Sequence, residues 1–148
     1  MLKFPVLHPE ILRALASGGH ASRVLITDGN YPHVNRPNPR APIVWANFVP
    51  GVLDCCTALQ MICQAVPIEA VHLMAPDKTG AYALASDPPI WSRFREILHQ
   101  YAGFSDPPAL LPKPQFNELA AGPEVCLVIA TAETAIWANV LLTIGVVR

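Results

Sequence analysis

The sequence predicts one α/β domain, residues 1–148, in which helices pack on a central sheet. Three observations support this fold class. Short apolar strands alternate with amphipathic helices from end to end, glycines and prolines separate them, and no internal repeat is present. The length of 148 residues suits a single domain with its own core.

The first half of the chain is expected to supply two helices and three strands. His8-Pro9-Glu10 opens a helix that Gly18-Gly19 ends, because proline and an acidic residue suit a first helical turn. The proline-rich segment 36–42 must be a loop. The remaining elements are strands at 24–26, 43–46 and 70–74, and a helix from about 50–51 to Pro67.

The second half continues the alternation. Pro88-Pro89 leads a helix with an apolar side, and the segment 103–114 holds four prolines and is expected to be an extended connector. A short helix at 115–121 follows, then strands at 125–129 and 140–142. The run 125–147 is long enough to span a bilayer, but the polar residues 131–134 interrupt it. Two buried strands therefore fit better than a membrane span.

The composition excludes some partners and suggests others. Hydrophobic residues make up 52% of the chain and charged residues 14%, so other copies are expected to cover much of an apolar surface. A net charge of −1 without a basic run argues against nucleic acid. The amino terminus lacks the pattern of a signal peptide, and the four cysteines form no Cys-x-x-Cys pair. We therefore expect reduced thiols in a cytoplasmic protein.

Motifs for common cofactors and nucleophiles are absent. The five histidines show no i, i+4 pair, and no Gly-x-Ser-x-Gly, Gly-x-Gly-x-x-Gly or P-loop pattern occurs. We therefore expect no metal and no cofactor. One metal-dependent alternative, built on His20, Asp28 and His33, is kept open for testing.

The stretch 18–33 carries the most informative chemistry. His20 precedes the strand 24–26, while Asp28, Asn30 and His33 follow it. An α/β protein builds small-molecule sites from polar groups at strand ends. A neutral imidazole can take up and return a proton near pH 7, and a carboxylate can fix its tautomer or hold substrate hydroxyls. The alternative is that His20 only bonds a loop backbone.

Two aromatic residues have two interpretations. Tyr31 and Trp137 could belong to the core, as most large aromatics do. Placed at strand edges, they could instead face the apolar side of a sugar ring. His72 and His99 are interpreted as structural.

Several short motifs, in order, resemble those of the ribose pyranase/fucose mutarotase family of sugar-anomer-interconverting proteins, with a closer match to the fucose branch. They are Leu7-His8-Pro9-Glu10-Ile11-Leu12, Gly19-His20, Asp28-Gly29-Asn30-Tyr31-Pro32, Pro88-Pro89-Ile90-Trp91, Phe116-Asn117-Glu118-Leu119-Ala120, Thr131-Ala132-Glu133, Trp137-Ala138-Asn139 and Gly145-Val146. The resemblance covers nearly the whole chain.

The resemblance implies a three-layer α/β domain assembled into pentameric rings or decamers, with sites between neighbouring subunits. It also implies a cofactor-free acid/base reaction on a monosaccharide. By resemblance His20 is the main acid/base, and Asp28 orients it or binds sugar hydroxyls. Further substrate contacts are implied at Asn30, Tyr31, Lys113, Asn117, Trp137 and Asn139.

The chain departs from the family pattern at three places. The family's Gly-His-Gly-Asp is Gly19-His20-Ala21-Ser22 here, and Lys113 and Asn117 stand where fucose mutarotases usually carry Arg and Tyr. Trp137 replaces a tyrosine and has no hydroxyl. Either another residue supplies the second proton transfer, the substrate differs, or the protein binds sugar without turnover. L-fucose or a related sugar is the expected substrate; D-ribose and a non-catalytic binding role are the alternatives.

Overall fold

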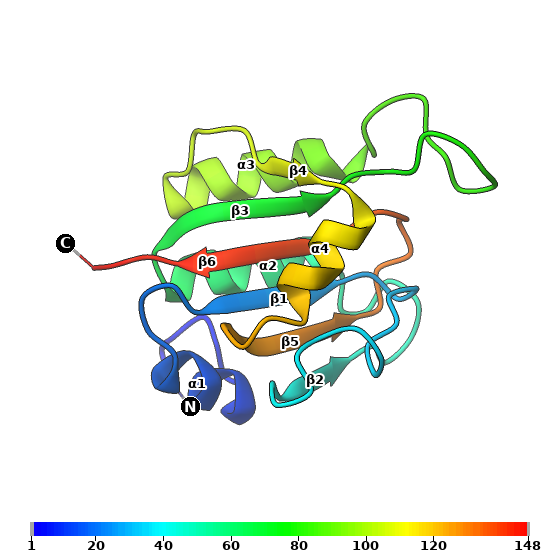
Figure 1. The fold of residues 1–148 in the computed structure, drawn as a ribbon. Helices are drawn as coiled ribbons and strands as arrows, with labels where there is room; N and C mark the ends of the chain where they lie inside the picture. The colour runs from blue at the N-terminus through cyan, green and yellow to red at the C-terminus, as the bar shows by residue number, and fades with distance from the viewer. Residues whose placement is uncertain (1, 148) are drawn as a thin grey trace.

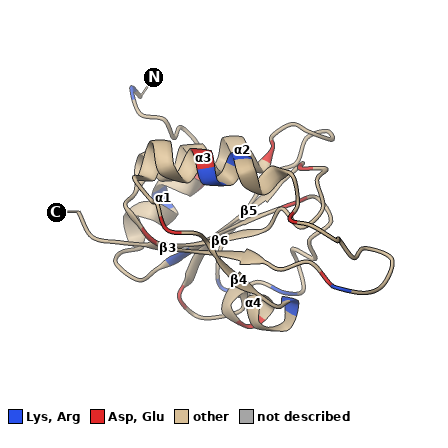
Figure 2. Ribbon diagram, turned by 90° about the horizontal axis from the view of Figure 1, so that it is seen from above, with Lys and Arg blue, Asp and Glu red and all other residues tan. Residues whose placement is uncertain are grey.

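The computed structural model describes residues 2–147, which form a six-stranded sheet between two helical layers (Figures 1 and 2). The elements are α1 (Pro9–Ser17), β1 (Arg23–Thr27), β2 (Ile43–Ala46), α2 (Cys55–Ala65), β3 (Ile68–Met74), α3 (Ile90–Ala102), β4 (Ala109–Leu111), α4 (Lys113–Ala120), β5 (Val125–Thr131) and β6 (Val140–Ile144). This arrangement confirms the predicted α/β layers.

The sheet has the strand order β2-β5-β1-β6-β3-β4. β6 is antiparallel to both of its neighbours, β1 and β3, whereas every other pair is parallel. The carboxyl ends of β1 to β5 therefore meet the amino end of β6 at one edge of the sheet. Residues that follow β1 and β3, precede β6, or begin α4 after β4 are thereby brought together.

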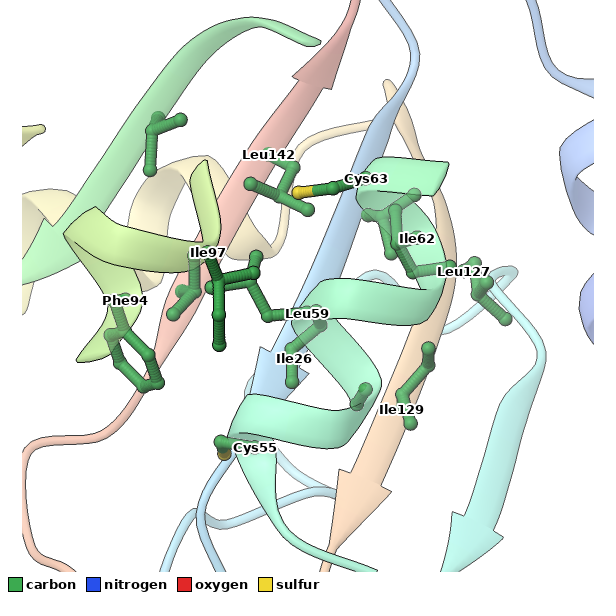
Figure 3. Close-up of a cluster of buried hydrophobic side chains, with 14 of the residues drawn as sticks. Ile26, Cys55, Leu59, Ile62, Cys63, Phe94, Ile97, Leu127, Ile129 and Leu142 are labelled. Carbon is green, nitrogen blue, oxygen red and sulfur yellow. The ribbon is translucent and has the colours of Figure 1, made fainter. Parts of the chain in front are cut away.

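The helices cover the two faces of the sheet unequally. α1, α2 and α3 lie on one face and α4 on the other (Figure 2). Side chains alternate accordingly along β1, where Val24 and Ile26 face the three-helix layer and Leu25 faces α4. Figure 3 shows the larger cluster, in which Leu59 of α2 lies over Ile26 and Ile62 lies further along the helix, toward Leu127. The fully buried positions on both faces explain why the strands are continuous apolar runs.

Two predicted boundaries are wrong. α2 begins at Cys55 rather than near 50–51, because the Asp54 carboxylate accepts the backbone N–H of Thr57 at 2.7 Å and caps the helix there. The connector predicted at 103–114 contains β4 and the first two residues of α4. β4 escapes recognition because it is three residues long and lies between prolines.

The apolar carboxy-terminal run forms two strands, as predicted. β5 and β6 do not pair with each other, because β1 lies between them. Within residues 2–147, no helix is both long and apolar enough to cross a membrane. The four cysteines are also unpaired, as predicted, and Cys55 and Cys63 are buried in the core.

Candidate functional site

Asp28 lies directly after β1, at the edge where the strand ends converge. Its side chain is buried and accepts three N–H groups. Oδ1 accepts the backbone N–H of Asn30 at 2.9 Å, and Oδ2 accepts the backbone N–H of Ala138 at 3.2 Å and Nδ2 of Asn139 at 3.0 Å. A buried carboxylate so anchored has a fixed orientation.

Burial raises the pKa of the Asp28 carboxyl above its ordinary value, while the bonds from Asn30, Ala138 and Asn139 oppose that shift. The nearby charge of Glu133 adds to the rise. The carboxyl is thus desolvated yet well supplied with donors.

A pocket of about 470 Å³ opens beside Asp28. It is lined by Asp28, Asn30, Tyr31, Pro32, Arg36, Met74, Asp77, Tyr82, Lys113, Asn117, Ile136, Trp137 and Asn139. Seven of the eight residues expected to form the site, all except His20, therefore line one pocket. The mixture of a few apolar surfaces with convergent polar groups is typical of small-molecule sites.

Trp137 connects this pocket to the loop 75–89, which extends from the body of the molecule (Figure 1). Its indole Nε1 donates to the carbonyl of Tyr82 at 2.9 Å, and its own carbonyl accepts Nε1 of Trp91 at 3.1 Å. Its backbone has φ of 62°, which is uncommon for a bulky residue. The Nζ of Lys113 lies 5.9 Å from the centroid of the indole ring.

Tyr31 lines the pocket from the turn that follows β1. Its side chain is buried, and its hydroxyl donates to Oδ1 of Asn117 at 3.3 Å. Asn117 lies four residues after Lys113 in α4, so both project from the same side of that helix. Burial raises the pKa of Tyr31 to about 12, although the charge of Arg36 opposes the rise. The phenol is therefore neutral at physiological pH.

His20 lies at the opposite end of β1 from Asp28. Its Nε2 is 2.9 Å from Oε2 of Glu69, and 58% of its side chain is exposed. The five residues of β1 separate His20 from Asp28, a span of more than about 15 Å at 3.3 Å per residue. A single chain therefore does not bring His20 into the pocket or into contact with Asp28.

His33 lies behind the pocket rather than in it. Its ring centroid is 5.8 Å from that of Tyr31 and 5.5 Å from that of Trp45. Burial lowers the pKa of its imidazole, and its Nε2 has no hydrogen-bond partner within residues 2–147. One chain thus does not assemble a site from His20, Asp28 and His33. In the described part of the chain, no cluster of three or more His, Cys, Asp or Glu residues could hold a metal ion.

Sequence reasoning missed several residues of the pocket: Arg36, Asp77, Tyr82, Met74 and Ile136. Met74, Asp77 and Tyr82 belong to the end of β3 and the loop after it. The rule that sites form beyond the carboxyl ends of parallel strands could have identified this loop. Arg36 lies in the loop between β1 and β2, where the same rule applies.

Comparisons with known proteins find similarity over nearly the whole chain. The sequence profile described as "RbsD / FucU transport protein family" matches residues 1–147. The fucose mutarotase of Homo sapiens is 28% identical over 145 residues, which cover 95% of this chain and 90% of that protein.

Two solved structures share the fold. One is the fucose mutarotase of Streptococcus pneumoniae in complex with L-fucose, with a TM-score of 0.81, 22% identity and full coverage of both chains. The other is Bacillus subtilis RbsD complexed with D-ribose, with a TM-score of 0.79, 20% identity and full coverage of both chains.

Proposed function

Because the chain belongs to the RbsD / FucU transport protein family, we propose that it is a monosaccharide mutarotase. It would interconvert the anomers of L-fucose or a related sugar by acid/base ring opening, without a cofactor. The observation that carries this proposal is the buried Asp28 carboxylate, which accepts three hydrogen bonds and lines a pocket of about 470 Å³. The human relative, named fucose mutarotase, supports the choice of sugar.

The composition of the pocket suits a monosaccharide. Trp137, Ile136 and Met74 offer apolar surface to the C–H groups of a sugar ring. Asp28, Asn30, Asn117 and Asn139 offer carboxylate and amide groups to its hydroxyls. This division favours a small polyol over an apolar ligand.

The reaction requires two proton transfers. One group removes the proton of the anomeric hydroxyl while the bond between C1 and the ring oxygen breaks, and a second group protonates that oxygen. The open-chain aldehyde rotates and closes on either face, with both transfers reversed. We assign the first role to His20 and the binding or orienting role to Asp28.

Within one chain, β1 separates His20 from Asp28 and the pocket. We therefore propose that a neighbouring subunit supplies His20. The high exposure of its imidazole supports this arrangement. Exposed apolar side chains near the edge strand β2, namely Trp45, Phe48, Val49 and Val52, are suited to contact other copies. We propose that the chains assemble into pentameric rings, and that two such rings form the decamer. We also propose that the protein is cytoplasmic, where its four thiols stay reduced.

A second candidate is a sugar-binding protein with little or no turnover. Asn117 and Trp137 favour it, because neither side chain has a hydroxyl that could exchange a proton. D-ribose is the alternative sugar, since the structural relative from Bacillus subtilis binds it.

Saturation-transfer NMR on an equilibrium mixture of anomers tests both candidates. We expect the protein to increase exchange between the α and β anomers of L-fucose well above the buffer rate, and to act less on D-ribose. Binding of L-fucose without added exchange would support the second candidate. If neither sugar binds or exchanges, both candidates are rejected.

A further inference from the structure

The pocket contains several groups that can hold a proton, but few are fixed in place. The guanidinium of Arg36 suits binding of oxygen acceptors rather than proton transfer. Asp77 and Tyr82 belong to the projecting loop 75–89, and Tyr82 is 71% exposed. The Lys113 side chain is also exposed, at the start of α4. A group that transfers a proton must be held in position, which favours a buried side chain over these three exposed ones.

Tyr31, by contrast, is 5% exposed and held at both ends. Its hydroxyl bonds to Asn117 at 3.3 Å, and its backbone N–H donates to the carbonyl of Asp28 at 3.2 Å. The Asp28 carboxylate accepts the N–H of Asn30 within the same turn, at 2.9 Å. The Tyr31 phenol and the Asp28 carboxylate thus belong to one four-residue turn, 28–31, and both residues line the pocket.

We propose that Tyr31 is the second proton-transfer group of the reaction proposed above, on which this assignment rests. As the bond between C1 and the ring oxygen breaks, its electron pair passes to the ring oxygen, which takes the phenol proton. His20 holds the proton of the anomeric hydroxyl. On closure the phenolate recovers its proton from the ring oxygen and His20 returns its own to O1, so both groups end unchanged.

The surroundings of Tyr31 suit this role. A phenol hydrogen rotates about the Cζ–Oη bond, so the hydroxyl can shift its donation from Asn117 to a sugar oxygen. The charge of Arg36 lowers the pKa that burial raises, so it favours the transient phenolate. Neither Arg36 nor Lys113 takes part in the ion pairs found between residues 2 and 147. Their charges are therefore not neutralised by a carboxylate within 4 Å.

The first test is Tyr31→Phe, measured by saturation-transfer NMR on L-fucose. We expect the maximal exchange rate to fall on the order of 10²-fold or more, the range for loss of a general acid, with KM changed less than about threefold. Tyr101→Phe, on α3 and outside the pocket, is the matched control and should retain the wild-type rate. A Tyr31→Phe rate within about threefold of wild type overturns the assignment while leaving the proposed function in place.

A second test covers the case in which Tyr31→Phe fails to fold. The chain has three tyrosines, so 3-fluorotyrosine can be incorporated into a Tyr82→Phe/Tyr101→Phe background, where only Tyr31 carries the label. Fluorine lowers the pKa of a phenol but preserves its shape and its bond to Asn117. We expect the basic limb of the pH profile of kcat to move to lower pH relative to the unlabelled background. An unmoved limb rejects Tyr31; absence of exchange in the wild-type protein rejects the proposed function instead.

Discussion

Asp28 and Asn139 form two hydrogen bonds with each other, one in each direction. Nδ2 of Asn139 donates to Oδ2 of Asp28 at 3.0 Å, and Oδ1 of Asn139 accepts the backbone N–H of Asp28, also at 3.0 Å. The antiparallel ladder between β1 and β6 aligns Ile26 with Val140, so Asp28 and Asn139 lie close together just beyond the paired positions. The pair therefore fixes the carboxylate at the point where the two strands enter the pocket.

The first prediction concerns this pair. Asn139→Asp removes the amide donor and adds a second buried carboxylate beside Asp28. We expect the free energy of unfolding to fall by about 3 kcal/mol or more, as for a buried charge without a partner. Urea unfolding at neutral pH measures the change. Asn35→Asp, an exposed loop position, is the matched control and should change stability by less than about 0.5 kcal/mol. Equal stability of the two variants would show that the pair is not structurally important.

The second prediction concerns Ala21, which follows His20 and has φ of 68°. A Cβ atom makes this left-handed conformation unfavourable by about 1–2 kcal/mol, and glycine adopts it without that cost. Glycine is also the residue of the family motif at this position. We expect Ala21→Gly to raise the free energy of unfolding by about 0.5–1 kcal/mol, after the larger entropy of the unfolded chain is included.

Ala16→Gly provides the control for Ala21→Gly, because Ala16 lies in α1 with ordinary helical geometry. Glycine should destabilise that site by up to about 1 kcal/mol. Chemical denaturation of both variants checks the signs. A fall in stability for both would mean that the conformation of Ala21 is not strained.

The same region shows how far the sequence predicts the structure. The sequence predicts the ends of β1, because Val24-Leu25-Ile26 is apolar and lies between glycine-containing turns. It therefore also predicts that Asp28, Asn30 and Tyr31 lie together after this strand. The periodic apolar helices were recognisable for the same reason, whereas β4 has no such pattern.

The residues that come from distant elements required more than local patterns. Asn139 and Trp137 meet Asp28 only because β6 runs antiparallel beside β1, and Lys113 and Asn117 only because α4 packs on the face opposite the other helices. Strand direction and choice of face follow from tertiary packing. The resemblance to known proteins indicates these residues. Neither a local sequence pattern nor the resemblance indicates the loop residues Asp77 and Tyr82.

The third prediction concerns pH and two histidines, of which His33 is buried and His72 is half-buried. Burial lowers the pKa of His33, and burial together with the charge of Arg23 lowers that of His72, each from an ordinary value of 6.5. Between the lowered pKa and 6.5 the unfolded chain binds more protons than the folded one, so protonation favours unfolding. Stability should therefore fall as pH drops below about 7 toward the lowered pKa values of these two imidazoles.

His33→Gln should reduce this dependence on pH, because glutamine does not titrate in that range. The readout is the slope of unfolding free energy against pH, from urea denaturation, rather than the stability at any one pH. Lost packing against Tyr31 and Trp45 would lower the whole curve without changing its slope. A slope equal to that of the wild type would contradict the role assigned to His33.

The fourth prediction tests whether two subunits build each site. His20→Ala and Asp28→Asn should each remove most anomer exchange, for different reasons. The first lacks the proposed acid/base, and the second replaces an acceptor oxygen with an amide that faces the donors of Ala138 and Asn139. Sedimentation should show that both variants keep the size of the wild-type assembly.

Co-assembly of these two inactive variants then distinguishes the arrangements. If His20 reaches the pocket of a neighbour, a randomly mixed oligomer contains sites with an intact His20 from one subunit and an intact Asp28 from the next, roughly a quarter of the total. Mixing by joint refolding or co-expression should thus restore a measurable exchange rate, whereas mixing without subunit exchange should not. If both residues acted within one chain, no mixture could contain a complete site. Persistent inactivity of verified mixed oligomers would therefore reject the shared site and return the search for the anomeric base to the pocket residues of a single chain.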